Sequence, residues 1–124
     1  MRKLVEAALE NMSTKDVFLF RISCAICGSE YGNKSTRFSK AGAPPPTPEK
    51  QIIYDVLYEQ ELRDARNIAV RSAAAHMNYC PICKQLVCNQ CFLICEDLDM
   101  CRQCAAELQQ RGQPVAPCLT DAAI

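Results

Sequence analysis

Four cysteine pairs that share one spacing constrain this chain more than any other feature of its sequence. Two residues separate the cysteines of each pair, which are Cys24/Cys27, Cys80/Cys83, Cys88/Cys91 and Cys101/Cys104. Two such pairs can surround one tetrahedral ion, because the tight turn inside each pair directs backbone N–H groups at sulfur. The sequence therefore predicts that these eight cysteines bind two Zn²⁺ ions, four thiolates to each ion.

The N-terminal residues bear on whether the thiols are reduced. The sequence holds ten cysteines in 124 residues, a density typical of a disulfide scaffold or of a metal site. Glu6, Glu10 and Asn11 interrupt the first apolar residues, so no signal peptide is expected, and no stretch is apolar enough for a membrane-spanning helix. We therefore expect a cytoplasmic protein, in which clustered thiols bind metal more often than they form disulfides.

Iron is the main competing metal. Iron–sulfur ferredoxins string three cysteines at two-residue intervals, and Cys88, Cys91 and Cys95 come closest to this without matching it. A mononuclear iron held by four thiolates stays open, because sulfur ligands suit both metals. The even pairs favour zinc over an iron–sulfur cluster or a redox-active dithiol.

The gaps between the pairs bear on how they combine. Only four residues, 84–87, separate the second pair from the third, which is a cramped connection for two pairs that close on one ion. If the first pair joins the third and the second joins the fourth, every gap is comfortable. This cross-brace assigns Cys24, Cys27, Cys88 and Cys91 to one ion and Cys80, Cys83, Cys101 and Cys104 to the other. Sequential pairing is the alternative.

One long helix dominates the predicted secondary structure. Thr47 is a suitable N-cap, Pro48 suits the first helical position, and neither glycine nor proline follows before His76. Glu59 and Arg63 are spaced for an ion pair on its surface. In chain order we expect an amphipathic helix over 4–12, a strand over 17–22, a flexible linker over 28–46, the long helix over 48–76, a short helix after Cys104, and a loose tail over 113–124.

These elements predict a small α+β fold, with residues 1–112 as a single zinc-binding domain. The segment from His76 to Cys91, followed by Met100 to Leu108, resembles the FYVE-type branch of cross-brace zinc fingers, whose treble-clef architecture RING fingers share. The resemblance implies short β-hairpins around the pairs and a helix that opens at the last pair. It reaches the first pair only across a long insertion. The basic cluster with which FYVE domains bind phosphatidylinositol 3-phosphate is absent, because His76, Met77, Asn78 and Tyr79 stand in its place.

The function expected from these features is a non-enzymatic protein-interaction or adaptor module with structural zinc. No nucleophile–base spacing or phosphate-binding loop is present. The long helix is the expected contact, either with another protein or with a second copy. A nucleic-acid-binding factor is the alternative, since Arg63, Arg66 and Arg71 could form a basic strip, although 14 basic and 14 acidic residues balance. A RING-like ubiquitin-transfer cofactor or a redox carrier are further alternatives, and membrane lipid is not an expected partner.

Three residues stand outside the pairs. Cys95 follows the apolar residues 92–94, and we expect it to be a buried strand residue. Cys118 is expected to be an exposed thiol in the tail. His76, the only histidine, is expected to cap the end of the long helix rather than to bind metal.

Overall fold

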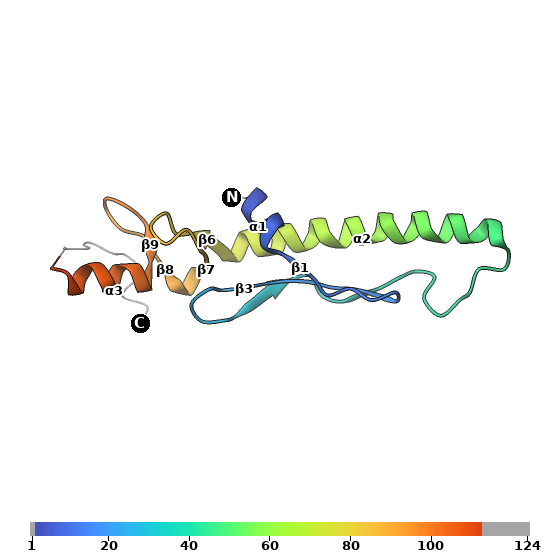
Figure 1. Cartoon of the computed structure of the whole chain (residues 1–124), viewed down its shortest axis with the longest axis horizontal. Coiled ribbons are helices and arrows are strands. Elements are labelled where there is room, and N and C mark those ends of the chain that lie inside the picture. Colours follow the sequence, from blue (N-terminus) through green and yellow to red (C-terminus); the bar gives the residue numbers. More distant parts are fainter. Residues whose placement is uncertain (1, 113–124) are drawn as a thin grey trace. The chain divides into compact units, whose positions relative to one another are not determined.

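The long helix is present with its predicted bounds. In a computed structural model, which describes residues 2–112, helix α2 runs from Pro48 to His76 without a break (Figure 1). The Thr47 hydroxyl accepts a hydrogen bond from the backbone N–H of Lys50 at 3.3 Å, which confirms Thr47 as the N-cap. The helix buries a stripe of small and β-branched side chains: Ala65, Ala69, Val70 and Ala73.

The chain divides into two units, which we call the helix unit and the cysteine unit. The helix unit comprises residues 2–22 and 31–73, and the cysteine unit comprises residues 23–30 and the described residues from 74 onward. Both units are therefore built from segments that are far apart in the sequence. The prediction of a single domain over 1–112 stays a prediction, and the predicted tail over 113–124 lies outside the described residues.

Short antiparallel strands form two small sheets in the helix unit. Helix α1 is followed by two small sheets, one in the order β1-β3-β4 and the other formed by β2 and β5. Glu10 of β1 pairs with Arg21 of β3, and Val17 of β2 pairs with Arg37 of β5. The bounds are Arg2–Ala8 for α1, Glu10–Asn11 for β1, Val17–Phe18 for β2, Phe20–Ser23 for β3, Glu30–Gly32 for β4 and Thr36–Arg37 for β5.

The core of the helix unit is aromatic. Phe18, Phe20 and Phe38 are buried against the small side chains of Ala65 and Ala69 on α2. The ring of Phe18 lies 6.0 Å from that of Phe38 in an edge-to-face arrangement, which favours aromatic pairs beyond the area that they bury. Alanines on the helix let the aromatic rings approach its backbone closely.

Four predicted boundaries differ from the structure. The closing helix, expected after Cys104, begins at Arg102, because Cys101 is its N-cap. Residues 28–46, expected to be a linker, contain strands β4 and β5 and bury Phe38, because α2 supplies apolar surface that a local pattern does not reveal. The first helix ends at Ala8 rather than at residue 12, since Glu10 and Asn11 pair with β3. The strand expected over 17–22 is split at Leu19 between two sheets.

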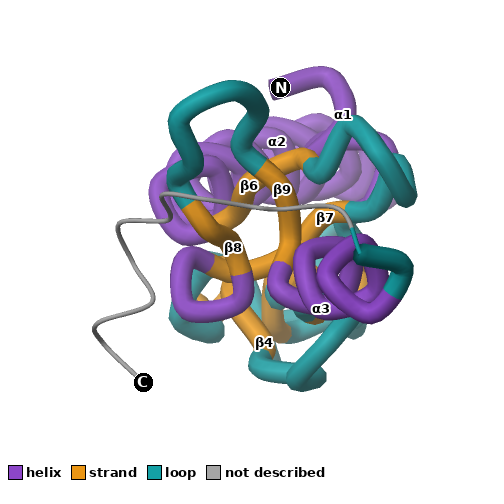
Figure 2. Tube along the Cα trace, turned by 90° about the vertical axis from the view of Figure 1, so that its left-hand side faces the viewer, coloured by secondary structure: helices purple, strands orange, loops and turns teal. Residues whose placement is uncertain are grey.

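The cysteine unit is built from two hairpins and a helix (Figure 2). β6 pairs with β7, and β8 pairs with β9, both antiparallel. A single 3₁₀ turn over Asn89–Cys91 joins the hairpins. The other bounds are Met77–Tyr79 for β6, Leu86–Cys88 for β7, Phe92–Leu93 for β8, Met100–Cys101 for β9 and Arg102–Gln110 for α3. The predicted α+β class is confirmed.

Candidate metal centre

The first two cysteine pairs lie in matching turns, over residues 24–29 and 80–85. In each turn the first cysteine donates its N–H to the carbonyl of the residue five positions on, at 2.9 Å. The carbonyl of that cysteine in turn accepts the N–H of Gly28 at 3.0 Å or of Lys84 at 2.8 Å. We call these turns the first and the second knuckle.

The other two pairs lie where a strand meets a helical turn. Cys88 ends β7 and Cys91 ends the 3₁₀ turn that follows it. Cys101 ends β9 and is the N-cap of α3, where its sulfur accepts the N–H of Cys104 at 3.4 Å. The last pair therefore opens a helix, as the resemblance to cross-brace fingers implies.

The structure brings the eight cysteines into two clusters. Within each cluster all four sulfurs lie within 4.8 Å of one another. Site A comprises Cys24, Cys27, Cys88 and Cys91, and site B comprises Cys80, Cys83, Cys101 and Cys104. The first pair thus joins the third and the second joins the fourth, so the cross-brace grouping is observed and the sequential alternative is not.

The spacing of the sulfurs suits a tetrahedral ion. In site A the sulfurs of Cys27 and Cys88 are 3.6 Å apart. In site B the sulfurs of Cys80 and Cys104 are 3.8 Å apart, and so are the sulfurs of Cys83 and Cys101. Four sulfurs at the Zn–S bond length of about 2.3 Å would be about 3.8 Å from one another. The donor set and its geometry therefore fit one metal ion at each site.

Backbone hydrogen bonds tie the pairs of each site together. The sulfur of Cys24 accepts the N–H of Cys88 at 3.2 Å and that of Ile26 at 3.4 Å. In site B the sulfur of Cys80 accepts the N–H of Cys101 at 3.4 Å. Such bonds orient a ligand and stabilise its thiolate form. They also bridge the two pairs that share each site.

Hydrogen bonds and burial shift the pKa values of the thiols within each site in opposite directions. The hydroxyl of Ser29 and then its backbone N–H lower the pKa of Cys27 to about 6. Burial raises the pKa of Cys80, but N–H groups led by that of Cys101 outweigh it and lower the pKa to about 6. Burial raises the pKa of Cys91 and of Cys104 well above the ordinary thiol value. Each site therefore combines a ready thiolate with a thiol that must lose its proton before it can bind metal.

Each cluster offers the complete four-sulfur donor set of a structural metal site. Four cysteine sulfurs complete the tetrahedral shell that Zn²⁺ takes in proteins and leave no position for water. When bound, the metal would supply a fixed cross-link between distant segments, since site A joins the turn at Cys24 to the end of β7. The chain's own contribution is to place four sulfurs and the N–H groups that bond to them.

The remaining candidates lie outside both clusters. Cys95 is half-buried, not buried as expected, because its thiol lies in the loop between β8 and β9. Its N–H donates to the carboxylate of Asp99 at 2.9 Å. His76 is the last residue of α2 and belongs to neither cluster. Cys118 lies outside the described residues.

Comparisons with protein-family models, with curated proteins and with solved structures find no match to this chain. The two four-cysteine clusters are the features of this chain that are consistent with a zinc-finger-like module. Among the described residues, no helix is long and apolar enough to cross a membrane.

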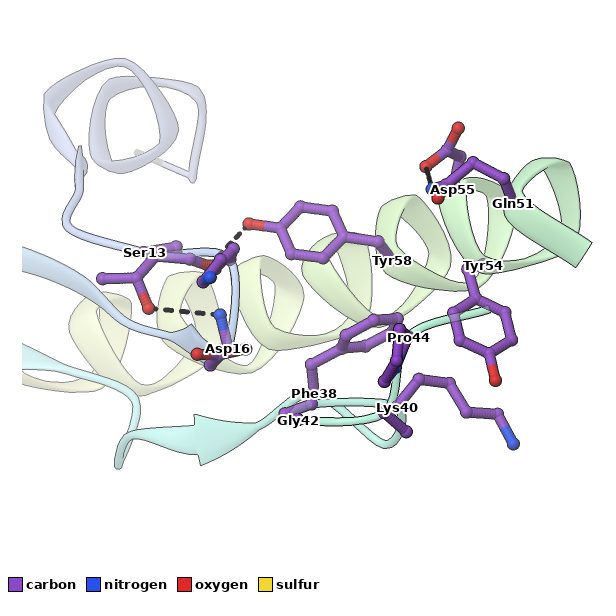
Figure 3. Close-up of a pocket in the computed structure, with 14 residues that line it drawn as sticks. Ser13, Asp16, Phe38, Lys40, Gly42, Pro44, Gln51, Tyr54, Asp55 and Tyr58 are labelled. Atoms are coloured by element: carbon purple, nitrogen blue, oxygen red, sulfur yellow. Dashed lines mark hydrogen bonds between the residues drawn. The ribbon is translucent and has the colours of Figure 1, made fainter. Parts of the chain in front are cut away.

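A cavity of about 740 Å³ in the helix unit was not anticipated from the sequence (Figure 3). Phe38, Tyr54 and Tyr58 line it, and the Tyr58 hydroxyl donates to the carbonyl of Thr14 at 2.8 Å. The ammonium of Lys40 lies 5.9 Å from the centre of the Tyr54 ring. The only sequence signal was the spacing of the two tyrosines, which places them on one face of α2.

Proposed function

We propose that this chain is a non-enzymatic protein-interaction module whose two four-cysteine sites hold structural Zn²⁺. The observation that carries the proposal is the pair of closed clusters, in which every metal position is taken by a cysteine sulfur. The order of the pairs favours a cross-brace of the FYVE and RING type. The requirement for reduced thiols favours the cytoplasm.

Zinc is proposed as a structural element because four thiolates in one cluster would repel one another without it. In each cluster four sulfurs meet with burial of three of the four residues. Thiolates in such proximity repel one another, whereas a divalent cation converts the repulsion into attraction. Structural zinc sites contribute an apparent ~10–16 kcal/mol in finger peptides, which exceeds the ~5–15 kcal/mol of net stability typical of a whole domain.

The interaction surface is proposed to be the first turns of α2. Ile52, Ile53 and Val56 are 67%, 48% and 50% exposed, respectively. Three large apolar side chains within five residues of one helix form a patch of the kind that marks contact sites in soluble proteins. The aromatic cavity beside Tyr54 extends the apolar surface available to a partner.

Native mass spectrometry followed by sedimentation equilibrium tests the proposal. We expect the chain mass plus two zinc ions, and self-association of the loaded protein that Val56→Asp weakens. Gln60→Asp, at another exposed position of the same helix, is the matched control, because it also adds one negative charge. A chain that binds no metal would contradict the proposed structural zinc sites. If the zinc-loaded protein is a monomer at all concentrations, a second copy is excluded as the partner. Binding of the same two variants to another protein chain would then be measured.

A further inference from the structure

Only two of the eight clustered cysteines are open to solvent. Cys27 of site A and Cys83 of site B are exposed, while the other six are buried. Both are the second cysteine of their knuckle, so they occupy equivalent positions in matching turns. A reagent in solution that attacks sulfur therefore meets these two thiolates before the others.

The two exposed cysteines differ in one contact. The sulfur of Cys27 is 3.1 Å from the hydroxyl of Ser29, which donates a hydrogen bond when the cysteine is a thiolate. Gln85 holds the equivalent position in the second knuckle, and its side chain makes no such bond. Among the described residues, no hydroxyl donates to the sulfur of Cys83, which lies 3.8 Å from the sulfur of Cys101.

The presence or absence of this hydroxyl contact affects how readily each of the two sulfurs reacts. A hydrogen bond withdraws electron density from a thiolate and occupies one of its lone pairs, so it lowers the rate of attack on an electrophile. Cys27 carries this protection and Cys83 does not. Lys84 follows Cys83 in the sequence, where Gly28 follows Cys27.

We propose that Cys83 is a covalent modification site for soft electrophiles, and that its modification opens site B while site A keeps its ion. The inference rests on the proposed zinc binding. With a maleimide, the Cys83 sulfur forms a bond to one alkene carbon, and the other carbon takes a proton from water. The product is a neutral thioether, a weaker ligand than a thiolate. The formal charge of the loaded site changes from −2 to −1, and its zinc becomes available to a chelator.

The test uses the full zinc-loaded chain with Cys95→Ser and Cys118→Ser, which removes the two thiols outside the clusters. One equivalent of N-ethylmaleimide is added, labelled peptides are quantified by mass spectrometry, and released zinc is followed with a colorimetric chelator. We expect Cys83 to be labelled about 3- to 10-fold faster than Cys27, the factor that corresponds to one hydrogen bond. One zinc ion should be released for each labelled chain.

Matched substitutions exchange the protection between the knuckles. Ser29→Ala should raise the labelling rate of Cys27 to that of Cys83, and Gln85→Ser should lower the rate of Cys83. Gln85→Ala is the control and should leave that rate unchanged, since the knuckle uses only the backbone carbonyl of this residue. Equal rates at the two cysteines in the parent chain, or no effect of Gln85→Ser, would overturn the inference. Absence of zinc before labelling would instead refute the proposed function.

Discussion

Gly28 and Lys84 occupy the same position in the two knuckles, and both have a left-handed backbone, with φ of 76° and 60°. In each case the residue follows the second cysteine and donates its N–H to the carbonyl of the first. The turn geometry therefore demands the left-handed conformation, whatever the side chain. Glycine adopts it without steric cost, whereas lysine does so with its Cβ close to the following carbonyl.

This relationship predicts opposite effects of two substitutions. Gly28→Ala should destabilise the zinc-loaded protein by about 1 kcal/mol, because an added Cβ meets no atom within 4 Å and only the backbone cost remains. Lys84→Gly should stabilise it by a similar amount or leave it unchanged, because relief of strain is partly offset by a more flexible unfolded chain. Thermal melting of the loaded chain measures both. Lys84→Ala keeps the strained backbone and controls for the lost charge. Destabilisation by Lys84→Gly would contradict the argument.

Loss of a single ligand should remove a single ion. Cys88→Ser should abolish site A and Cys104→Ser should abolish site B, because a serine hydroxyl is a poor replacement for a thiolate. Native mass spectrometry should then show one bound zinc ion in each variant and two in the parent chain. Cys95→Ser is the control and should retain both ions, since Cys95 belongs to neither cluster. Loss of an ion on substitution of Cys95 would require a different ligand set.

Metal affinity should rise with pH, because each site must lose protons to bind. The pKa values of Cys27 and Cys80 are lowered to about 6, so both are thiolates at pH 7.5 and compete with protons only below about pH 6. The pKa values of Cys91 and Cys104 are raised, so both release a proton on binding throughout the neutral range. Competition with a chelator should show a gradual decline from pH 8 and a steeper one below about pH 6. Calorimetry in buffers of different ionisation enthalpy should count the protons, and an affinity independent of pH would contradict the argument.

The parts of the structure that could be predicted have short-range causes. The bounds of α2 follow from Thr47 and Pro48 at its start and from the absence of glycine and proline up to His76. The cross-brace grouping follows from the four-residue gap between Cys83 and Cys88, which limits what one ion can reach. Both depend on spacing along the chain, which a sequence states directly.

The missed features depend on partners distant in the sequence. Phe38 lies among polar residues, and its burial requires the alanines of α2, nearly thirty positions further on. Strands of two residues such as β2 and β5 are defined by their pairing and carry no periodicity of their own. The contact of Ser29 with Cys27 likewise becomes visible only when the knuckle is folded.

Gly32 should tolerate no side chain. A Cβ at this position would overlap the carbonyl oxygen of Phe20 in β3, and neither strand backbone can give way without loss of sheet pairing. We expect Gly32→Ala to destabilise the protein by roughly 1–3 kcal/mol, the cost typical of overpacking. Ser35→Ala, at an exposed position of the same segment, should have little effect. Equal urea midpoints for the two variants would mean that β4 does not lie against β3.

The aromatic core offers a direct test of whether residues 28–46 are part of the fold. Phe38 is 8% exposed and its ring lies 5.3 Å from that of Tyr58. Phe38→Ala should cost about 3–5 kcal/mol through lost burial and a residual cavity. Tyr58→Phe keeps the ring but loses the bond to the Thr14 carbonyl, so it should cost only about 0.5–1.5 kcal/mol. Urea unfolding at constant zinc measures both. A neutral Phe38→Ala would return this segment to the flexible linker that its composition suggests, whereas the expected ranking would establish Phe38 as a core residue.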